Sequence, residues 1–163
     1  MTKASIFFAG ALATLLACGG APPSPQTSAG PTGADTPTDQ CLAIARAKRE
    51  RKADEPARIT AKHILVKYAG AKKAPETVTR TAGEACLRAL EAREKLQQGM
   101  SFADAVAAYS EEPGAATREG TLGSITRSDV VPPFADAAFE LGRGDVSHVV
   151  ETDYGFHIIL RTE

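Results

Sequence analysis

The chain has 163 residues and a formal net charge of -1, which fits one domain with additional segments and provides no net positive field for nucleic-acid binding. Hydrophobic residues make up 43% of the chain, enough for one modest core, and tryptophan is absent. No run of about 18 apolar residues occurs, so the sequence predicts no helix that remains in a membrane.

The first 17 residues have the character of a targeting segment. Lys3 precedes the apolar run "IFFAGALATLLA", which has the length of a signal-peptide core. The run ends in "LLAC", and Cys18 marks the change to small residues. This motif resembles the lipobox of bacterial lipoproteins, which implies a signal peptide over 1–17, lipidation of Cys18 and an outer-membrane anchor facing the periplasm. The alternative is an ordinary secretory signal that happens to contain a cysteine.

Residues 18–40 are dominated by Pro, Gly, Ser and Thr, and the segment after the cysteine has no large apolar residue. Such a composition predicts a disordered tether, because little surface can be buried to offset chain entropy. Residues 41–57 are instead rich in Ala, Arg and Lys, which predicts a basic helical segment that Pro56 ends. Two interpretations stay open for this segment: a solvated helix packed lightly on the domain, or a basic stretch that contacts anionic lipid headgroups.

Two further cysteines, Cys41 and Cys86, also leave two alternatives open. An exported compartment is oxidising, which would allow a disulfide between them. They would otherwise be two small buried side chains, and the sequence does not supply the geometry that decides between these readings.

The folded domain is predicted to span 58–163. Alternation in "RITAKHILVK" predicts a strand with one face formed by Ile59, Ala61, His63 and Leu65. A loop follows, and residues 81–98 predict a helix, because small and apolar residues recur there at helical spacing before Gly99. Ser101 is expected to cap a second helix that ends at Tyr109.

The second half of the domain begins with a turn-rich segment over 111–123, and the letters "SITR" predict a short strand. The stretch "PPFADAAFELG" predicts a short helix, with proline at its start and Gly142 at its end. Residues 146–163 predict two strands joined by a turn at 153–155. This element order indicates an α+β domain.

Two of the three histidines, His63 and His157, lie in the middle of predicted strands. A lone strand histidine is usually a satisfied core residue, but two of them could touch if their strands are neighbours. Neutral imidazoles can then satisfy each other, since each offers one donor and one acceptor. No spacing typical of a metal site, a nucleophile motif or a nucleotide-binding loop occurs, so we expect neither a metal nor a cofactor.

Four blocks of the sequence resemble the parvulins, a family of peptidyl-prolyl cis-trans isomerases: "AKHILVK", "SFADAVAAYSEEPG", "GTLGSITRSDVVPPFADAAFELGRGDVS" and "YGFHIILRTE". The resemblance covers about 58–163. It implies a parvulin-like domain of the FKBP-like superfold, in which about four helices surround a four-stranded antiparallel sheet. It also implies rotation about X-Pro bonds in polypeptide substrates without a cofactor. Nothing in the sequence suggests more than a monomer.

The resemblance also implies roles for individual residues. His63 and His157 match the paired histidines of the family, and Thr152 matches a hydroxyl that contacts them. Glu112 stands where parvulins place a Cys or Asp beside the peptide bond. The proline-binding pocket matches Leu122, Val130 and Phe134, and many relatives have Met at the second of these positions.

A loop with three lysines follows the first predicted strand. Many bacterial parvulins lack such a loop, and its length resembles that of the phosphoserine/phosphothreonine-proline-specific parvulins of eukaryotes. That resemblance implies a clamp for a phosphate or an acidic side chain, formed by Lys67, Lys72 and Lys73. A solvated basic loop is the alternative. For the protein as a whole, a non-catalytic periplasmic chaperone that uses the same groove is the alternative to an isomerase of exported proteins.

Overall fold

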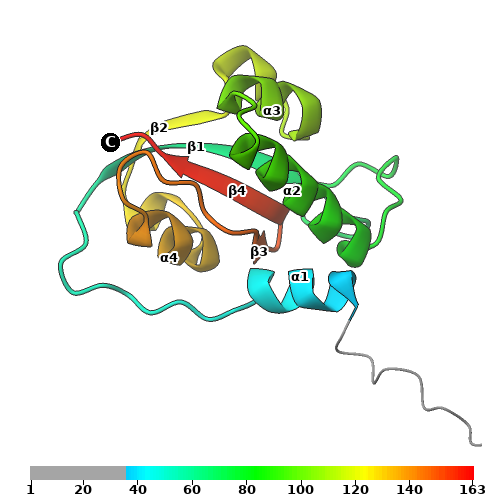
Figure 1. The fold of residues 1–163 in the computed structure, drawn as a ribbon, viewed down its shortest axis with the longest axis horizontal. Coiled ribbons are helices and arrows are strands. Elements are labelled where there is room, and N and C mark those ends of the chain that lie inside the picture. Colours follow the sequence, from blue (N-terminus) through cyan, green and yellow to red (C-terminus); the bar gives the residue numbers. More distant parts are fainter. Residues whose placement is uncertain (1–35) are drawn as a thin grey trace, which may run out of the picture. The chain divides into compact units, whose positions relative to one another are not determined.

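A computed structural model describes residues 36–163. None of the helices in that part of the chain is long and apolar enough to span a membrane. The elements in chain order are α1 (Pro37–Ala45), β1 (Ile59–Val66), α2 (Ala82–Gln97), α3 (Phe102–Tyr109), η1 (Ala116–Arg118), β2 (Thr121–Ile125), η2 (Arg127–Asp129), α4 (Pro132–Glu140), β3 (Val150–Thr152) and β4 (Gly155–Arg161), where η marks a short 3₁₀ helix (Figure 1).

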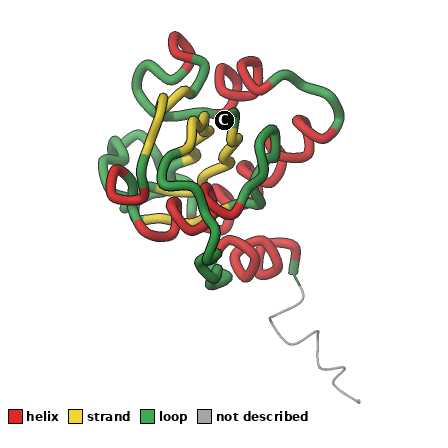
Figure 2. The backbone as a smooth tube through the Cα atoms, turned by 90° about the vertical axis from the view of Figure 1, so that its left-hand side faces the viewer, coloured by secondary structure: helices red, strands yellow, loops and turns green. Residues whose placement is uncertain are grey.

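The four strands form one sheet in the order β2-β1-β4-β3, and every neighbouring pair is antiparallel. The last strand of the chain therefore pairs with the first and lies at the centre of the sheet. Helices and loops surround the strands, as the rotated view in Figure 2 shows. The predicted α+β fold with a four-stranded antiparallel sheet is thus confirmed.

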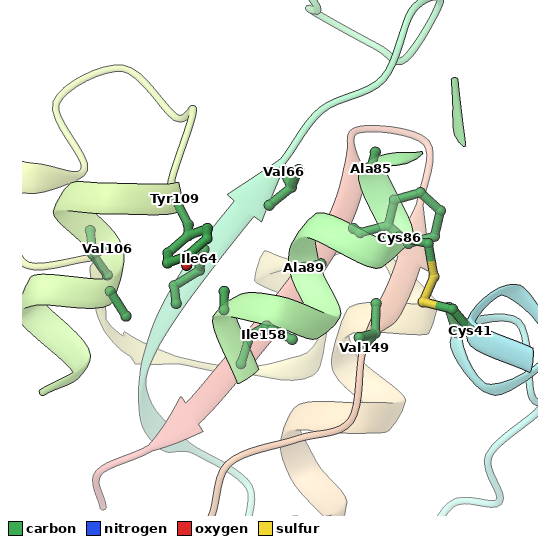
Figure 3. Packing of buried hydrophobic residues seen from close by; sticks show 14 of the residues in the cluster. Cys41, Ile64, Val66, Ala85, Cys86, Ala89, Val106, Tyr109, Val149 and Ile158 are labelled. Atoms are coloured by element: carbon green, nitrogen blue, oxygen red, sulfur yellow. A yellow bond between two sulfur atoms is a disulfide. The ribbon is translucent and has the colours of Figure 1, made fainter. Parts of the chain in front are cut away.

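Each face of the sheet has its own hydrophobic core. On one face, α2 and α3 pack on even-numbered residues such as Ile64, Val66 and Ile158, and the alanines of α2 allow the helix to approach closely (Figure 3). On the other face, α4 packs on odd-numbered residues such as Ala61 and Ile159. Because side chains alternate along a strand, both central histidines fall on the α4 face.

Side-chain N-caps determine where helices α2 and α3 begin. The Thr81 hydroxyl accepts a hydrogen bond from the Glu84 amide, and the Glu84 side chain accepts one from the Thr81 amide, which completes a capping box. Ser101 caps α3 by accepting from the Asp104 amide. Both predicted helices are therefore present at nearly their predicted bounds.

The basic helix predicted over 41–57 is wrong in its position. Helix α1 begins at Pro37, inside the predicted tether, and ends at Ala45, while residues 46–57 form neither helix nor strand. The reason lies in "TPTD": Thr36 accepts from the Asp39 amide as the N-cap, and a proline occupies the first helical position. The predicted signal peptide, Cys18 and the tether up to residue 35 lie outside the described residues.

The cysteines that the sequence left undecided form a disulfide. Cys41 of α1 and Cys86 of α2 are both buried, with a Cα–Cα separation of 6.1 Å (Figure 3). The bond joins the N-terminal helix to the helix that covers the centre of the sheet. The N-terminal helix is therefore covalently fixed to the domain rather than resting lightly on it.

Candidate functional site

The two strand histidines meet on the α4 face of the sheet. His63 pairs with Ile159 across the ladder and His157 pairs with Leu65, so the imidazoles are diagonal neighbours on one face. Their Nδ1 atoms lie 3.2 Å apart, and the rings are stacked with centroids 5.4 Å apart. Both side chains are buried, so this polar pair is placed within the fold and not on its surface.

Glu112 extends the pair toward solvent. Its Oε2 lies 2.8 Å from His63 Nε2, and Arg118 also donates to the same carboxylate. The hydrogen bond from His63 is the largest cause that lowers the pKa of Glu112 to about 2, and Arg118 adds to this effect, while burial opposes it. Glu112 is therefore ionised at neutral pH and can only accept hydrogen bonds.

His157 and Thr152 form the inner end of the network. Thr152 Oγ1 lies 2.8 Å from His157 Nε2, and both residues are buried. Burial lowers the pKa of His157 to about 3, with a further contribution from His63, so the imidazole is neutral at pH 7.

The partners of the network define the direction of its hydrogen bonds. The ionised Glu112 accepts from His63 Nε2–H, and in the neutral form of His63 the Nδ1 atom is then the acceptor for His157 Nδ1–H. His157 Nε2 then accepts from the Thr152 hydroxyl. The chain of hydrogen bonds runs from the buried Thr152 hydroxyl to the partly buried Glu112 carboxylate, and every ring nitrogen in it has a partner.

Phe134 forms an apolar wall against this network. It is buried, and its ring packs edge-to-face on both imidazoles, with centroid distances of 5.7 Å to His63 and 5.2 Å to His157. A cavity of about 510 Å³ opens in front of these rings; it is lined by His63, Leu65, Lys73, Glu112, Leu122, Ser128, Asp129, Val130, Val131, Phe134, Tyr154 and His157. The cavity thus has a polar floor and apolar sides.

Two glycines fix the backbone around the histidine pair. Gly120 has φ +72°, accepts a hydrogen bond from the His63 amide at 2.8 Å, and would place a Cβ 2.4 Å from the His63 carbonyl oxygen. Gly155 has φ +135° and would place a Cβ 2.4 Å from the Val66 carbonyl oxygen. Neither position has room for a side chain, so glycine permits the close approach that brings β1 beside its neighbours.

The three loop lysines occupy different environments. Lys67 is buried, and its Nζ donates to the Lys73 carbonyl oxygen at 2.8 Å. Lys73 lines the main cavity, and with Lys67 it also lines an adjoining space of about 300 Å³. Lys72 lines neither space and lies over the Tyr154 ring at 5.1 Å.

The structure adds residues that the sequence did not single out. Tyr154 lines both spaces and stands in the turn before β4. It is the first residue of the parvulin-like block "YGFHIILRTE", and that position could have marked it as a candidate site residue. Ser128 and Asp129 follow the short strand β2 and line the cavity. No sequence pattern marks Arg118 as a site residue, because its contact with Glu112 depends on the turn of η1.

The arrangement suits a reaction that breaks no covalent bond. Both cysteines of the described residues are bonded to each other, so neither supplies a thiol. The cavity instead combines an apolar side that fits a compact ring with a fixed polar network that can act on a nearby amide. Such a site can change the conformation of a bound peptide by binding and orientation alone.

Comparisons with known proteins agree with this geometry. The family model described as "PPIC-type PPIASE domain" matches residues 43–163. Peptidyl-prolyl cis-trans isomerase Pin1 of Arabidopsis thaliana is 37% identical over 114 residues, covering 64% of this chain and 94% of that protein. Foldase protein PrsA of Geobacillus sp. is 40% identical over 106 residues, covering 65% of this chain but only 32% of the foldase.

A solved structure extends the comparison to the fold. The parvulin of Nitrosopumilus maritimus superposes with a TM-score of 0.50 at 32% sequence identity, covering 66% of this chain and 98% of that one. The residues that the family model matches include both strands that carry the histidine pair, β1 and β4. The chain therefore belongs to the PpiC-type parvulin family, and it is a peptidyl-prolyl cis-trans isomerase that acts on proline-containing polypeptides.

Proposed function

We propose that this isomerase acts on X-Pro bonds of exported polypeptides and favours an acidic or phosphorylated residue before the proline. The observation that carries the second part is the buried Lys67 ammonium beside the cavity. Among the described residues, no carboxylate lies within ion-pair distance of it, and its hydrogen-bond partner is the Lys73 carbonyl oxygen. A buried ammonium bonded only to a neutral carbonyl favours a further anionic partner.

The proline ring is proposed to occupy the apolar side of the cavity. Leu122, Val130 and Phe134 line it, and only the last of them is fully buried in the domain core. Partly exposed side chains at a cavity wall gain burial when an apolar ring binds to them. The ring would then face Phe134, while the preceding peptide bond faces the polar network.

The catalytic contribution follows from the chemistry of the amide. Rotation about an X-Pro bond crosses a barrier of about 20 kcal/mol because the amide loses its resonance on the way. A dry apolar pocket holds the ring and excludes water, and groups that are already oriented stabilise the twisted carbonyl. His63, Glu112, Thr152 and His157 are proposed to hold this polar environment rather than to exchange protons with the substrate.

The residue before proline is proposed to face the adjoining space. That space shares Leu65, Lys73, Glu112 and Tyr154 with the main cavity, so one extended peptide could reach both. Glu112 is already engaged by His63 and Arg118, so its charge is largely balanced. Lys67 and Lys73 are then the groups that would receive a carboxylate or a phosphate, and Lys72 would add to the positive potential.

The preference is tested by two-dimensional NMR exchange on matched Ala-Pro, Glu-Pro and phosphoserine-Pro peptides. We expect exchange on all three, with kcat/KM about tenfold higher for the phosphorylated peptide than for Ala-Pro, since a charged hydrogen bond contributes about 1.4 kcal/mol or more. Lys73→Gln should remove most of this preference, whereas Lys48→Gln, an exposed lysine outside both spaces, should not. Equal rates on the three peptides would contradict the lysine clamp but not the isomerase activity.

Export is proposed from the signal-like N-terminus with its "LLAC" motif. The disulfide between Cys41 and Cys86 supports an oxidising compartment, where such bonds persist. Membrane fractionation with lipid labelling tests the anchor. We expect the wild-type chain to carry label and to sediment with membranes, and Cys18→Ser to lose both. Retention of label in Cys18→Ser would contradict lipidation at this residue.

A further inference from the structure

Residues 46–57, here called the arm, link the disulfide-bonded helix α1 to the first strand. The arm follows the domain surface and passes below α4 in the view of Figure 1. Although it has no helix or strand, it makes side-chain contacts with three separate elements. Arg46 bonds to Glu151 of β3 at 2.5 Å, and Lys52 bonds to the Glu140 carbonyl oxygen of α4 at 2.6 Å.

The arm's most buried contact is made by Glu55. Its side chain is only 6% exposed, and its two oxygens accept from Nε and Nη2 of Arg127 at 2.5 and 2.6 Å. This is the two-pronged geometry in which a guanidinium binds a carboxylate most specifically. Arg51 also contacts Glu55, from the more exposed side. A nearly buried acid in this geometry fixes the position of its partner.

Arg127, whose position Glu55 fixes, contacts the segment that forms one wall of the main cavity. It opens η2, and its Nη1 donates to Asp136 of α4 at 2.6 Å, so it ties the start of η2 to the middle of the helix. The chain between these two residues includes the cavity-lining residues of η2, of α4 and of the link between them: Ser128, Asp129, Val130, Val131 and Phe134. Holding both ends of this segment fixes the wall on which the proline ring is proposed to rest.

Glu55 does not line the main cavity itself, so any effect on substrate must act through Arg127. The arm is also fixed at its other end, since the disulfide anchors α1 and Arg46 bonds beside Thr152, the hydroxyl partner of His157. We propose that the arm is a brace for the cavity wall, and that Glu55 is a positioning residue for proline binding. The proposal rests on the proline pocket proposed above.

The test compares Glu55→Gln with Glu50→Gln, a matched change at an exposed arm residue for which the described part of the chain shows no side-chain partner. Isomerisation of an Ala-Pro peptide is measured by NMR exchange over a range of peptide concentrations. We expect KM to rise about threefold or more in Glu55→Gln, with kcat within about twofold of wild type, because the polar network does not touch the arm. Glu50→Gln should match wild type in both constants.

A second measurement separates positioning from general loss of stability. KM does not depend on the fraction of folded enzyme, so partial unfolding of Glu55→Gln lowers the observed rate without imitating the expected result. In an Arg127→Lys background, which lacks the two-pronged contact, Glu55→Gln should have little further effect, since both changes break one interaction. An unchanged KM in Glu55→Gln, or fully additive effects of the two changes, would overturn the brace.

The readout also distinguishes failure of the brace from failure of the proposed pocket. The methyl signals of Val130 and the ring signals of Phe134 report the wall without any substrate. If Ala-Pro peptide does not shift these signals in wild type, the proposed pocket is wrong. If the peptide shifts them in wild type but Glu55→Gln leaves both the free-state signals and KM unchanged, the pocket stands and the brace is wrong.

Discussion

Single residues set the state of the polar network, and Glu112 defines its polarity. An ionised carboxylate can only accept, so it holds a His63 proton on Nε2, and in the neutral form of His63 this sets the hydrogen-bond roles of His157 and Thr152. A Cys or Asp at this position is what the parvulin resemblance leads one to expect. The glutamate in this chain contacts His63 and Arg118 through the same carboxylate oxygen.

Replacement of Glu112 by Gln tests this role. A neutral amide can donate as well as accept, so the direction of the network is no longer fixed and Arg118 loses its charged partner. We expect kcat on an Ala-Pro peptide to fall about tenfold, in line with the loss of one charged hydrogen bond. Glu94→Gln, at an exposed position of α2, serves as the control. A Glu112→Gln enzyme with wild-type kcat would show that the carboxylate does not act on the network.

Acidification should destabilise the fold through His157. Its pKa is about 3 when folded, against 6.5 for the free side chain, because burial disfavours the charged imidazole. The unfolded chain therefore binds a proton that the folded chain does not, so the contribution is present above pH 6.5 and is lost as the pH falls toward 3. Between pH 7 and 5.5 we expect the free energy of unfolding to fall by about 1 kcal/mol, measured by urea titration.

Variants separate the contribution of His157 to the pH dependence of stability from the contributions of other titratable groups. His157→Gln should flatten the dependence in this range, while His148→Gln should largely retain it. The pKa of Glu112, about 2 instead of 4.5, adds a further loss only below pH 4.5, since the carboxylate loses its ion pairs when it is protonated. A slope that is unchanged in His157→Gln would contradict the buried neutral imidazole.

Elements far apart in sequence are joined by the disulfide between α1 and α2. The bond joins two cysteines that are 45 positions apart in the sequence, and the closed loop restricts the conformations of the unfolded chain. We expect reduction to lower the free energy of unfolding by about 2–4 kcal/mol, measured by urea titration with and without dithiothreitol. The double variant Cys41→Ala, Cys86→Ala should not respond to the reductant. Equal stability of the oxidised and reduced wild-type chains would contradict a constraining bond.

The sequence predicted elements well where local signals were strong. The alternation of β1 and the alanine spacing of α2 are local, and both elements appear close to their expected bounds. Helix α1 begins outside the predicted basic segment because its start is set by the cap at Thr36, which basic composition does not indicate. The arginines and lysines that suggested a longer helix instead bond to acidic and carbonyl groups of distant elements, which no local pattern reveals.

The site could be predicted only in part for the same reason. Alternation placed His63 and His157 on strand faces, but their contact required the pairing of the first strand with the last. The contacts of Arg118 and Arg127 join residues through turns and the arm, and the disulfide depends on helix packing. Long-range geometry therefore decided what the residue types alone left open.

At the scale of the whole molecule, the domain places a polar network and an apolar wall on one face of a sheet whose central strand ends the chain. The other face supplies a separate core under α2 and α3. The histidine pair of the site thus lies on the two central strands, while its outer wall comes from the η2–α4 segment that the arm contacts. The strands therefore position the histidine network, and the η2–α4 segment shapes the proposed proline pocket.

The most direct test of this account fills the cavity. Val130 is partly exposed at the cavity wall, so Val130→Trp should block the proline ring without opening the core, and Ile44→Trp, at an exposed position of α1, is the control. NMR exchange on an Ala-Pro peptide should then be close to the uncatalysed rate in Val130→Trp and unchanged in Ile44→Trp, with both variants folded. Wild-type exchange in a folded Val130→Trp enzyme would contradict the assignment of catalysis to this cavity.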